Sequence, residues 1–340
     1  MSNPTALVDL LATALNAREA LIAQLQREQS DCYRLFHGSV EGWPGLTVDR
    51  YGSLLLVQSF HSPLNAAALA ELEAFYGAAL PGLDLLYNDR SGANSRIGNA
   101  LSEAQQAIAV APREVQELGV RYLIQGRHAG QDPWLFLDAR AGRRRVMAEA
   151  KGKSLLNLFA YTCGVGVAAA KAGASHVVNV DFAESSLNVG RENARLNELP
   201  IRLRFVQSDA FAAMRQLAGI GQPVMVRGKR MPAFPKLEPH AFDLVYLDPP
   251  RYAKSAFGVV DLVHDYQALF KPALLCTREG GTLICCNNVA EVERERWGEL
   301  LQRAAQKAGR TLRELEWIAP EADFPSHDGK PPLKIALLRV

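Results

Sequence analysis

Three segments of the chain, each at the end of an apolar run, have the residue types and spacing of a nucleoside-binding site. The run SLLNLF leads into a loop of small residues containing Gly164 and Gly166, and Asp181 ends the next apolar run, 15 residues after Gly166. Glycines let backbone N–H groups approach an anionic ligand at a helix start, and a strand-end acid can accept both hydroxyls of a ribose. In the third segment, QSDAF, Asp209 could accept from an adenine amine.

A fourth segment, LDPPRY, forms a rigid corner without backbone donors at its two prolines. Pro249 and Pro250 have no N–H and favour an extended chain, so Asp248 projects its carboxylate and carbonyl oxygens from the strand end. The ring of Tyr252 is placed to stack on a base, a contact worth ~1–3 kcal/mol. The corner resembles the Asp-Pro-Pro motif of S-adenosylmethionine-dependent methyltransferases that act on nitrogen atoms of bases.

The glycine loop by itself leaves other classes open. GVGVAA also satisfies the G-x-G-x-x-A pattern of a nicotinamide-dependent oxidoreductase. That alternative explains Gly164, Gly166 and Asp181 but not LDPPRY. A non-catalytic RNA-binding protein with the same fold, and a methyltransferase for a small metabolite or a protein, are further alternatives.

The elements that would position these segments alternate between strand and helix from Ser154 onward. This order predicts an α/β, Rossmann-like, doubly wound and mainly parallel sheet, with a last strand that can be antiparallel. Strands one and four flank the switch point of such a sheet, so Gly164, Gly166 and Asp248 should share one crevice. The basic, proline-rich segment 224–240 is expected to be an inserted loop that helps to hold RNA. The expected strands are SLLNLF, HVVNVD, IRLRFVQ, FDLVYLD, GTLICC and LKIALLRV.

The sequence pattern predicts two domains. A smaller N-terminal α+β domain is expected over residues 1–115, and the second domain over residues 116–340. The first 30 residues have helical periodicity, and RLFHGSVEGWPGLTVDRYGSLLLVQSF reads as three strands joined by turns. A helix over Leu64–Tyr76 and a strand LDLLYND should follow. Residues 116–135 are expected to form a hairpin or a bridging element, in which VRYLI and WLFLD are separated by a polar turn.

Composition bounds the class of protein. The chain has 340 residues, of which 48% are hydrophobic and 22% charged, as in globular proteins, and no apolar run reaches the ~18 residues of a membrane span. Five cysteines without zinc-type spacing favour the reducing cytosol and no metal site. The net charge of +2 divides into −5 for residues 1–115 and +7 for the rest, which suggests a polyanionic partner.

Residues 130–340 resemble the Rossmann-like domain of the RlmI/RlmK type of 23S ribosomal RNA methyltransferases. The preceding HGSVEGWPGLTVDRYGSLLLVQ is similar to that family's central α+β domain, and the PUA domain that often precedes it is expected to be absent. The resemblance implies S-adenosylmethionine as cofactor and 23S RNA, or a large-subunit assembly intermediate, as partner. It also implies a cytoplasmic enzyme without a membrane partner, and is compatible with a homodimer. The matching stretches are FLDARAGRRR, LLNLFAYTCGVGVAAAKAGA, VNVDFAESSLNVGRENARLN, SDAF, LDPPRYAKS and GGTLICCNN.

The same resemblance implies which residues form the site. The basic run Arg143–Arg145 is either a solvated helix face or a contact to RNA phosphates. The residues expected to present the base are Asp248, Pro249, Pro250, Tyr252 and Asn288. The residues expected to bind the cofactor are Asp138, Arg140, Asn157, Phe159, Tyr161, Thr162, Gly164, Gly166, Asp181, Phe182, Ser208, Asp209, Ala210 and Asp248.

The segment after the fifth strand indicates which atom is methylated. An enzyme acting on C5 of cytosine needs a cysteine that adds to the ring. Aligned on Gly280-Gly281, the position of the RlmI-type cysteine is Asn288 here, with Cys285 and Cys286 slightly earlier. Asn287-Asn288 instead resembles the RlmK type, which methylates N7 of guanine, a nitrogen that needs only in-line placement about 3–3.5 Å from the methyl carbon. Guanine N7 is therefore favoured. Cytosine C5 methylation by a displaced cysteine, and an asparagine pair that merely caps the strand end, remain open.

Overall fold

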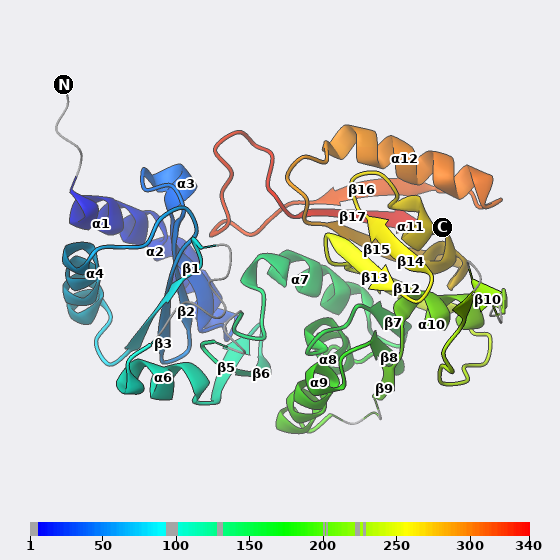
Figure 1. Ribbon diagram of the computed structural model, residues 1–340, viewed down its shortest axis with the longest axis horizontal. Helices are drawn as coiled ribbons and strands as arrows, with labels where there is room; N and C mark the ends of the chain where they lie inside the picture. Colours follow the sequence, from blue (N-terminus) through cyan, green and yellow to red (C-terminus); the bar gives the residue numbers. More distant parts are fainter. Residues whose placement is uncertain are drawn as a thin grey trace. The chain divides into compact units, whose positions relative to one another are not determined.

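The chain forms two compact units, which Figure 1 shows coloured along the sequence. The computed structural model describes residues 6–92, 101–127, 132–199, 201, 203–221, 225–226 and 229–340. One unit contains Met1–Asp138 together with Glu321–Pro331, and the other contains Ala139–Pro320 together with Pro332–Val340.

The N-terminal unit is built on a four-stranded sheet in the order β1-β2-β3-β4, in which only β3 and β4 are parallel. Alternate strand residues such as Val48 and Val57 point to one face, where they pack with Leu11 and Leu72 from the helices. The three predicted strands joined by turns are thus present. The elements are α1 (Leu7–Ala17), α2 (Glu19–Arg27), β1 (Cys32–His37), α3 (Gly38–Glu41), β2 (Leu46–Tyr51), β3 (Leu54–Ser59), α4 (Ala66–Ala79), β4 (Asp84–Asp89), α6 (Glu103–Val110), β5 (Arg113–Glu117) and β6 (Val120–Ile124).

The hairpin of β5 and β6 belongs to this first unit, so the division of the chain comes later than residue 115. The Asp31 N–H donates to the Gln116 carbonyl at 2.9 Å, and the Gln116 N–H donates to an Asp31 carboxylate oxygen at 2.7 Å. The predicted second strand WLFLD is wrong. Trp134 there has a positive φ of 70°, and a short 3-10 turn, η2 (Leu137–Ala139), leads into the second unit.

The second unit contains a seven-stranded sheet in the order β16-β17-β15-β12-β7-β8-β9. The five strands from β15 to β9 are parallel, and β17 is antiparallel to both of its neighbours, as the sequence allowed. The predicted α/β doubly wound fold is confirmed. Its sheet and flanking helices are α7 (Arg140–Glu149), β7 (Ser154–Leu158), α8 (Gly164–Lys171), β8 (His176–Asp181), α9 (Glu184–Leu196), β9 (Arg204–Gln207), α10 (Ala210–Leu217), β12 (Phe242–Leu247), α11 (Gln267–Leu275), β15 (Thr277–Asn287), α12 (Arg294–Lys307), β16 (Glu314–Ile318) and β17 (Lys334–Arg339).

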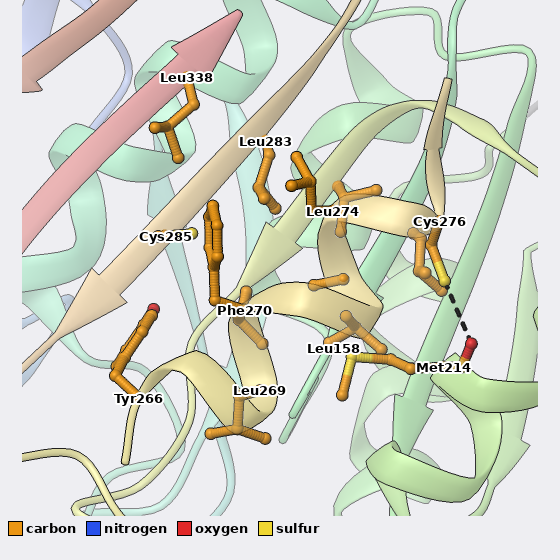
Figure 2. Packing of buried hydrophobic residues seen from close by; sticks show 14 of the residues in the cluster. Leu158, Met214, Tyr266, Leu269, Phe270, Leu274, Cys276, Leu283, Cys285 and Leu338 are labelled. Atoms are coloured by element: carbon orange, nitrogen blue, oxygen red, sulfur yellow. Dashed lines mark hydrogen bonds between the residues drawn. The ribbon is translucent and has the colours of Figure 1, made fainter. Parts of the chain in front are cut away.

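Successive residues of the central strands point to opposite faces of the sheet. Leu158 and Val180 join the apolar cluster formed with α10, α11 and α12. Figure 2 shows part of this cluster, with Phe270 and Leu274 of α11 packed against Leu158 and Leu283. The side chain of Asn179 instead contacts α8 on the other face. Helices therefore cover both faces, which leaves the carboxyl ends of the parallel strands as the place for a ligand.

A network of charges joins α7 to the two last strands. Arg339 of β17 donates to Glu149 at 2.7 Å, and Arg145 donates to Glu149 at 3.1 Å and to both oxygens of Glu316 at 2.8 and 2.6 Å. Burial alone would raise the pKa of Glu149, but the hydrogen bonds and charge of Arg339, with help from Arg145 and Lys153, lower it to about 2.

Glu149→Gln is expected to lower the free energy of unfolding by roughly 2 kcal/mol at pH 7. Because the folded pKa of Glu149 lies below the ordinary 4.5, its contribution is complete above about pH 4.5 and is lost as the pH falls through about 2. Urea titrations of wild type and variant from pH 7 down to pH 2.5 measure the difference. A difference that stays constant over this range would contradict the assignment. Glu192→Gln breaks only an exposed pair with Arg195 and should change stability by less than about 1 kcal/mol.

Candidate active site at the carboxyl edge of the sheet

The loop after β7 holds three non-glycine residues in the left-handed region. Phe159, Tyr161 and Cys163 have φ values of 57°, 49° and 60°. Each such residue costs roughly 1–2 kcal/mol, and strain of this kind persists where the surroundings enforce it, often at functional sites. The Ala160 N–H donates to the Val180 carbonyl at 2.9 Å, and the Cys163 N–H donates to the Ala160 carbonyl at 2.7 Å. These hydrogen bonds therefore hold the loop in a single backbone conformation at the start of α8.

Asp181, the last residue of β8, holds this loop from the neighbouring strand. One carboxylate oxygen accepts from the Tyr161 N–H at 2.8 Å and the other from the Ala183 N–H at 2.9 Å. Burial raises the pKa of Asp181, and the N–H groups of Ala183, Tyr161 and Phe182 oppose that rise. A carboxylate oxygen can accept more than one hydrogen bond, so Asp181 keeps capacity for two hydroxyl groups. These two bonds fix the orientation of the carboxylate at the end of β8.

The register of the parallel strands brings the other predicted strand-end residues to the same edge. Leu158 lies opposite both Val180 and Leu247, so the residues that follow, Phe159 and Asp248, leave neighbouring strands at the same level. The Ser208 N–H donates to the Asp181 carbonyl at 2.9 Å. Phe182, next to Asp181, is 72% exposed, unusual for so large an apolar ring. An exposed aromatic ring at a strand end can stack on a planar ligand.

Two of the residues expected at the cofactor, Gly166 and Asn157, take part in the contact between α8 and the sheet. A Cβ at Gly166 would lie 2.0 Å from the Asn179 side-chain oxygen, so glycine is required there by packing. The Asn157 amide donates to the same oxygen at 2.9 Å, within the buried part of the sheet. Sequence spacing could not separate these roles, because a glycine near a helix start serves either helix–sheet packing or ligand approach. Gly164, the first residue of α8, is half-buried.

The sequence did not single out Asn193, which supports the loop from α9. Its amide donates to the Thr162 carbonyl at 3.0 Å, and both residues are buried. The signal was available, because a polar residue on the apolar face of a helix usually satisfies a backbone group. Cys163 beneath the loop is fully buried, and burial together with the charge of Asp181 raises the pKa of its thiol. It is a packing residue in the loop.

Asp209 lies after β9 at the same edge, with both of its carboxylate oxygens engaged by backbone groups. One oxygen accepts from the Phe211 N–H at 2.8 Å and caps α10, whose first residue, Ala210, is buried. The other accepts from the Ala256 N–H at 3.1 Å. Ala256 lies in the turn of a hairpin formed by β13 (Tyr252–Ser255) and β14 (Gly258–Asp261).

The side of the edge formed by β12 and β15 offers polar and aromatic groups to solvent. Pro249 is buried and Pro250 exposed, while Asp248 is half-buried. Tyr252 is 51% exposed, and the Arg251 guanidinium lies 5.6 Å from the centre of its ring. Asn288 is exposed after the end of β15. The buried Asn287 side chain accepts from the Val289 N–H at 3.0 Å, so the first asparagine of the pair has a local structural role.

The two cysteines of β15 are enclosed by the protein. Cys285 lies in the apolar cluster beside Phe270 (Figure 2), and burial raises the pKa of its thiol. The Cys286 thiol is also fully buried and donates to the Tyr246 hydroxyl at 3.2 Å. A nucleophile must reach its substrate as a thiolate, and neither burial nor a raised pKa allows this. The burial of both thiols weighs against the cytosine C5 alternative.

The FLDARAGRRR segment spans the junction of the two units. Asp138 is half-buried and ends the first segment of the N-terminal unit, and Arg140, the first residue of α7, is fully buried. Arg143 is 3% exposed, and Arg145 is held by Glu149 and Glu316. Arg143 and Arg145 are therefore not part of a solvated helix face, and neither guanidinium is available for a contact to RNA phosphates.

The inserted segment 224–240 is described only in part. Met225–Val226 (β10) pairs with Lys229–Arg230 (β11), and Val224, Arg227 and Gly228 lie outside the described residues. The Gln216 side chain of α10 donates to the Pro235 carbonyl at 2.9 Å and accepts from the Leu237 N–H at 3.0 Å. The second half of the insert is thus tied to α10.

Comparison with known proteins defines the class. A family model described as S-adenosylmethionine-dependent methyltransferase matches residues 33–339, and the chain belongs to this family. Ribosomal RNA large subunit methyltransferase I of Shigella boydii is 26% identical over 306 residues, 88% of this chain and 72% of that protein. Its counterpart in Aeromonas salmonicida is 28% identical over 319 residues, 91% and 74% of the two chains. A methyltransferase solved in complex with SAH has a TM-score of 0.80 at 23% identity, and the match covers 100% of this chain and 82% of that one.

The expected enzyme class and cofactor are therefore confirmed, and the nicotinamide-dependent alternative is wrong. The edge described above fits S-adenosylmethionine. Asp181 retains acceptor capacity for a ribose, the N-terminus of α8 lies beside the fixed loop, and the exposed Phe182 ring is free to cover an adenine. Within the described ranges, no group of three or more His, Cys, Asp or Glu could hold a metal ion. Among the same residues, no helix combines the length and apolarity needed to cross a membrane.

Proposed function

We propose that this methyltransferase modifies a base of large-subunit ribosomal RNA, and that N7 of guanine is its target atom. The observation that carries the choice of atom is the edge beside Asp248, where exposed Tyr252 and Asn288 lie at the strand ends and both neighbouring thiols are buried. Support for the RNA comes from the relatives named as large-subunit ribosomal RNA methyltransferases. We also propose the cytoplasm as the location, since ribosomal RNA is modified where it is assembled.

The reaction asks the protein mainly to orient two reactants. S-adenosylmethionine supplies a methyl group on a sulfonium, whose loss neutralises the positive charge. Guanine N7 has a lone pair available, so no residue has to remove a proton or form a covalent adduct. In the proposal, Asp181 accepts the ribose hydroxyls, Phe182 covers the adenine, and the loop 159–163 with Gly164 encloses the remainder of the cofactor.

The base would be presented by the β12 side of the same edge. The Pro249-Pro250 corner sets the direction of the chain, Tyr252 stacks on the base, and the amide of Asn288 donates to and accepts from the purine edge. Asp248 is half-buried, and its oxygens can accept from the single amino group of guanine. The basic residues of the insert, such as Arg230 and Lys236, would contact phosphates.

The test is methyl transfer from labelled S-adenosylmethionine to total RNA from a strain that lacks the gene, followed by nucleoside analysis. Label in 7-methylguanosine supports the proposal. Label in 5-methylcytidine would overturn the choice of atom, and the absence of label from all RNA despite cofactor binding would overturn RNA as the substrate. Light scattering of the purified chain would decide whether it forms a homodimer.

Asn288→Ala is expected to lower kcat/KM for RNA by about tenfold to 100-fold. The edge of the bound base would lose the Asn288 amide, which can both donate and accept a hydrogen bond. Cys286→Ser is the matched control two residues away, since its hydroxyl can keep the bond to Tyr246. It should methylate RNA at close to the wild-type rate. Loss of methylation in Cys286→Ser with normal cofactor binding would point to the cysteine mechanism.

A further inference from the structure

The hairpin of β13 and β14 carries Tyr252 and is anchored at its base by ordinary packing. Val260 and Leu262 are buried in the apolar cluster, and the Leu262 N–H donates to the Arg251 carbonyl at 3.2 Å. These contacts hold one end of the hairpin, close to the strand β12 that precedes it (Figure 1). A two-stranded hairpin is only marginally stable by itself, so its far end needs a second attachment.

That second attachment is made by Asp209 at the turn. The Ala256 N–H donates to one oxygen of Asp209 at 3.1 Å, and the Phe257 ring packs beside Phe211 with ring centres 6.1 Å apart. The other oxygen of Asp209 accepts from the Phe211 N–H at 2.8 Å, as the cap of α10. A single carboxylate thus joins the end of β9, the start of α10 and the tip of the hairpin. A hydrogen bond to a charged oxygen is roughly twice as strong as one between neutral groups.

We propose that Asp209 is a positioning residue that fixes the Tyr252 hairpin through the Ala256 N–H and so sets how the base is presented for methylation. The proposal rests on Tyr252 as the residue that stacks on the base. It gives Asp209 a task at the hairpin, distinct from the adenine contact expected from its strand-end position, because one carboxylate oxygen accepts from the Ala256 N–H and the other from the Phe211 N–H. The two tasks predict different consequences when only the hairpin bond is removed.

Two variants remove this bond from opposite sides. Ala256→Pro deletes the donor and leaves Asp209 unchanged. Ala256 is the second residue of the turn Ser255–Gly258 and has no positive φ, so proline is compatible with the turn. Asp209→Asn can keep an acceptor for the α10 cap while turning an amide nitrogen toward the Ala256 N–H. Ala256→Ser retains the N–H at the same exposed position and is the matched control.

Hydrogen exchange of the free protein measures the attachment without any RNA. The amides of residues 252–261 should exchange about five- to tenfold faster in Ala256→Pro and Asp209→Asn than in wild type or Ala256→Ser. Amides of α10 should stay protected in all four proteins, which shows that the fold is intact. Unchanged exchange in the hairpin of both variants would overturn the proposal.

Kinetics with unmodified 23S RNA measure the consequence. Both variants should raise KM for this RNA about tenfold while the Kd for S-adenosylmethionine stays within about twofold of wild type. If Asp209→Asn weakens cofactor binding tenfold while Ala256→Pro behaves as wild type, Asp209 acts on the adenine and the proposal is overturned. If the wild type methylates no RNA, the proposed function fails, and hydrogen exchange alone then decides whether Asp209 holds the hairpin.

Discussion

Asp181→Asn is expected to weaken binding of S-adenosylmethionine about 100-fold. The substitution keeps the shape of the side chain but replaces one acceptor oxygen with an NH2 donor. This donor would face the N–H of Tyr161 or of Ala183, and it cannot accept from a ribose hydroxyl. Two charge-assisted hydrogen bonds are lost or weakened at once, and the strained loop loses its support. Isothermal titration calorimetry gives the Kd, and the rise of the melting temperature with added cofactor should shrink accordingly.

Asp243→Asn is the matched control for this experiment. The Asp243 carboxylate also accepts two hydrogen bonds, from the N–H and from the hydroxyl of Ser154, each at 2.8 Å. Asp243, however, lies near the amino-terminal end of β12. The variant should bind S-adenosylmethionine with the wild-type Kd even if it is less stable. An equal loss of affinity in both variants would mean that the effect comes from general loosening of the sheet.

Gly166→Ala is expected to destabilise the protein by about 3 kcal/mol, although alanine favours helices. The added Cβ would lie 2.0 Å from the Asn179 side-chain oxygen, which is itself held by the Asn157 amide at 2.9 Å and has little room to move. The helix α8 would have to shift away from the sheet, and the loop before it would move as well. Urea titration measures the loss, and cofactor affinity should fall with it.

Gly77→Ala in α4 separates helix propensity from packing. No atom lies within 4 Å of the Cβ that the substitution adds, so it should stabilise the protein by about 0.5–1 kcal/mol. The double variant Gly166→Ala/Asn179→Ala should be more stable than Gly166→Ala alone, because the obstructing amide is gone. A Gly166→Ala protein as stable as wild type would show that α8 does not approach the sheet as closely as described.

The sequence predicted the strands of the second unit better than the roles of individual residues. Apolar runs ending in Asp181 and LDPPRY indicate a parallel sheet and its ligand edge, because the alternation of elements alone determines both. The amphipathic edge strand β16 was not predicted, since ELEWI carries acids among its apolar residues. The apolar residues of WLFLD satisfy a strand pattern, but a turn with a positive φ at Trp134 interrupts it.

Roles that depend on backbone groups could not be predicted from residue types. The strand-end position of Asp209 predicts a contact to an adenine amine, but not its bonds to the N–H groups of Phe211 and Ala256, residues whose side chains carry no signal for them. The glycine loop predicts Gly166, and the family resemblance predicts Asn157, as cofactor residues. Only the pairing of β7 with β8 shows that Asn179 lies opposite Asn157 and takes the space beside Gly166.

The segment Glu321–Pro331 belongs to the N-terminal unit although it lies between the last two strands of the other sheet. An oxygen of the fully buried Asp323 accepts from the Arg34 N–H at 2.9 Å, and the Arg34 guanidinium lies 4.4 Å from the centre of the Phe324 ring. The N-terminal unit is therefore made of two separate chain segments, and a single cut in the chain cannot divide the two units. A fragment that begins at Ala139 would keep the loop Glu321–Pro331 but lose the residues against which this loop packs. Exchange of the N-terminal unit with that of a relative would need three crossover points along the gene.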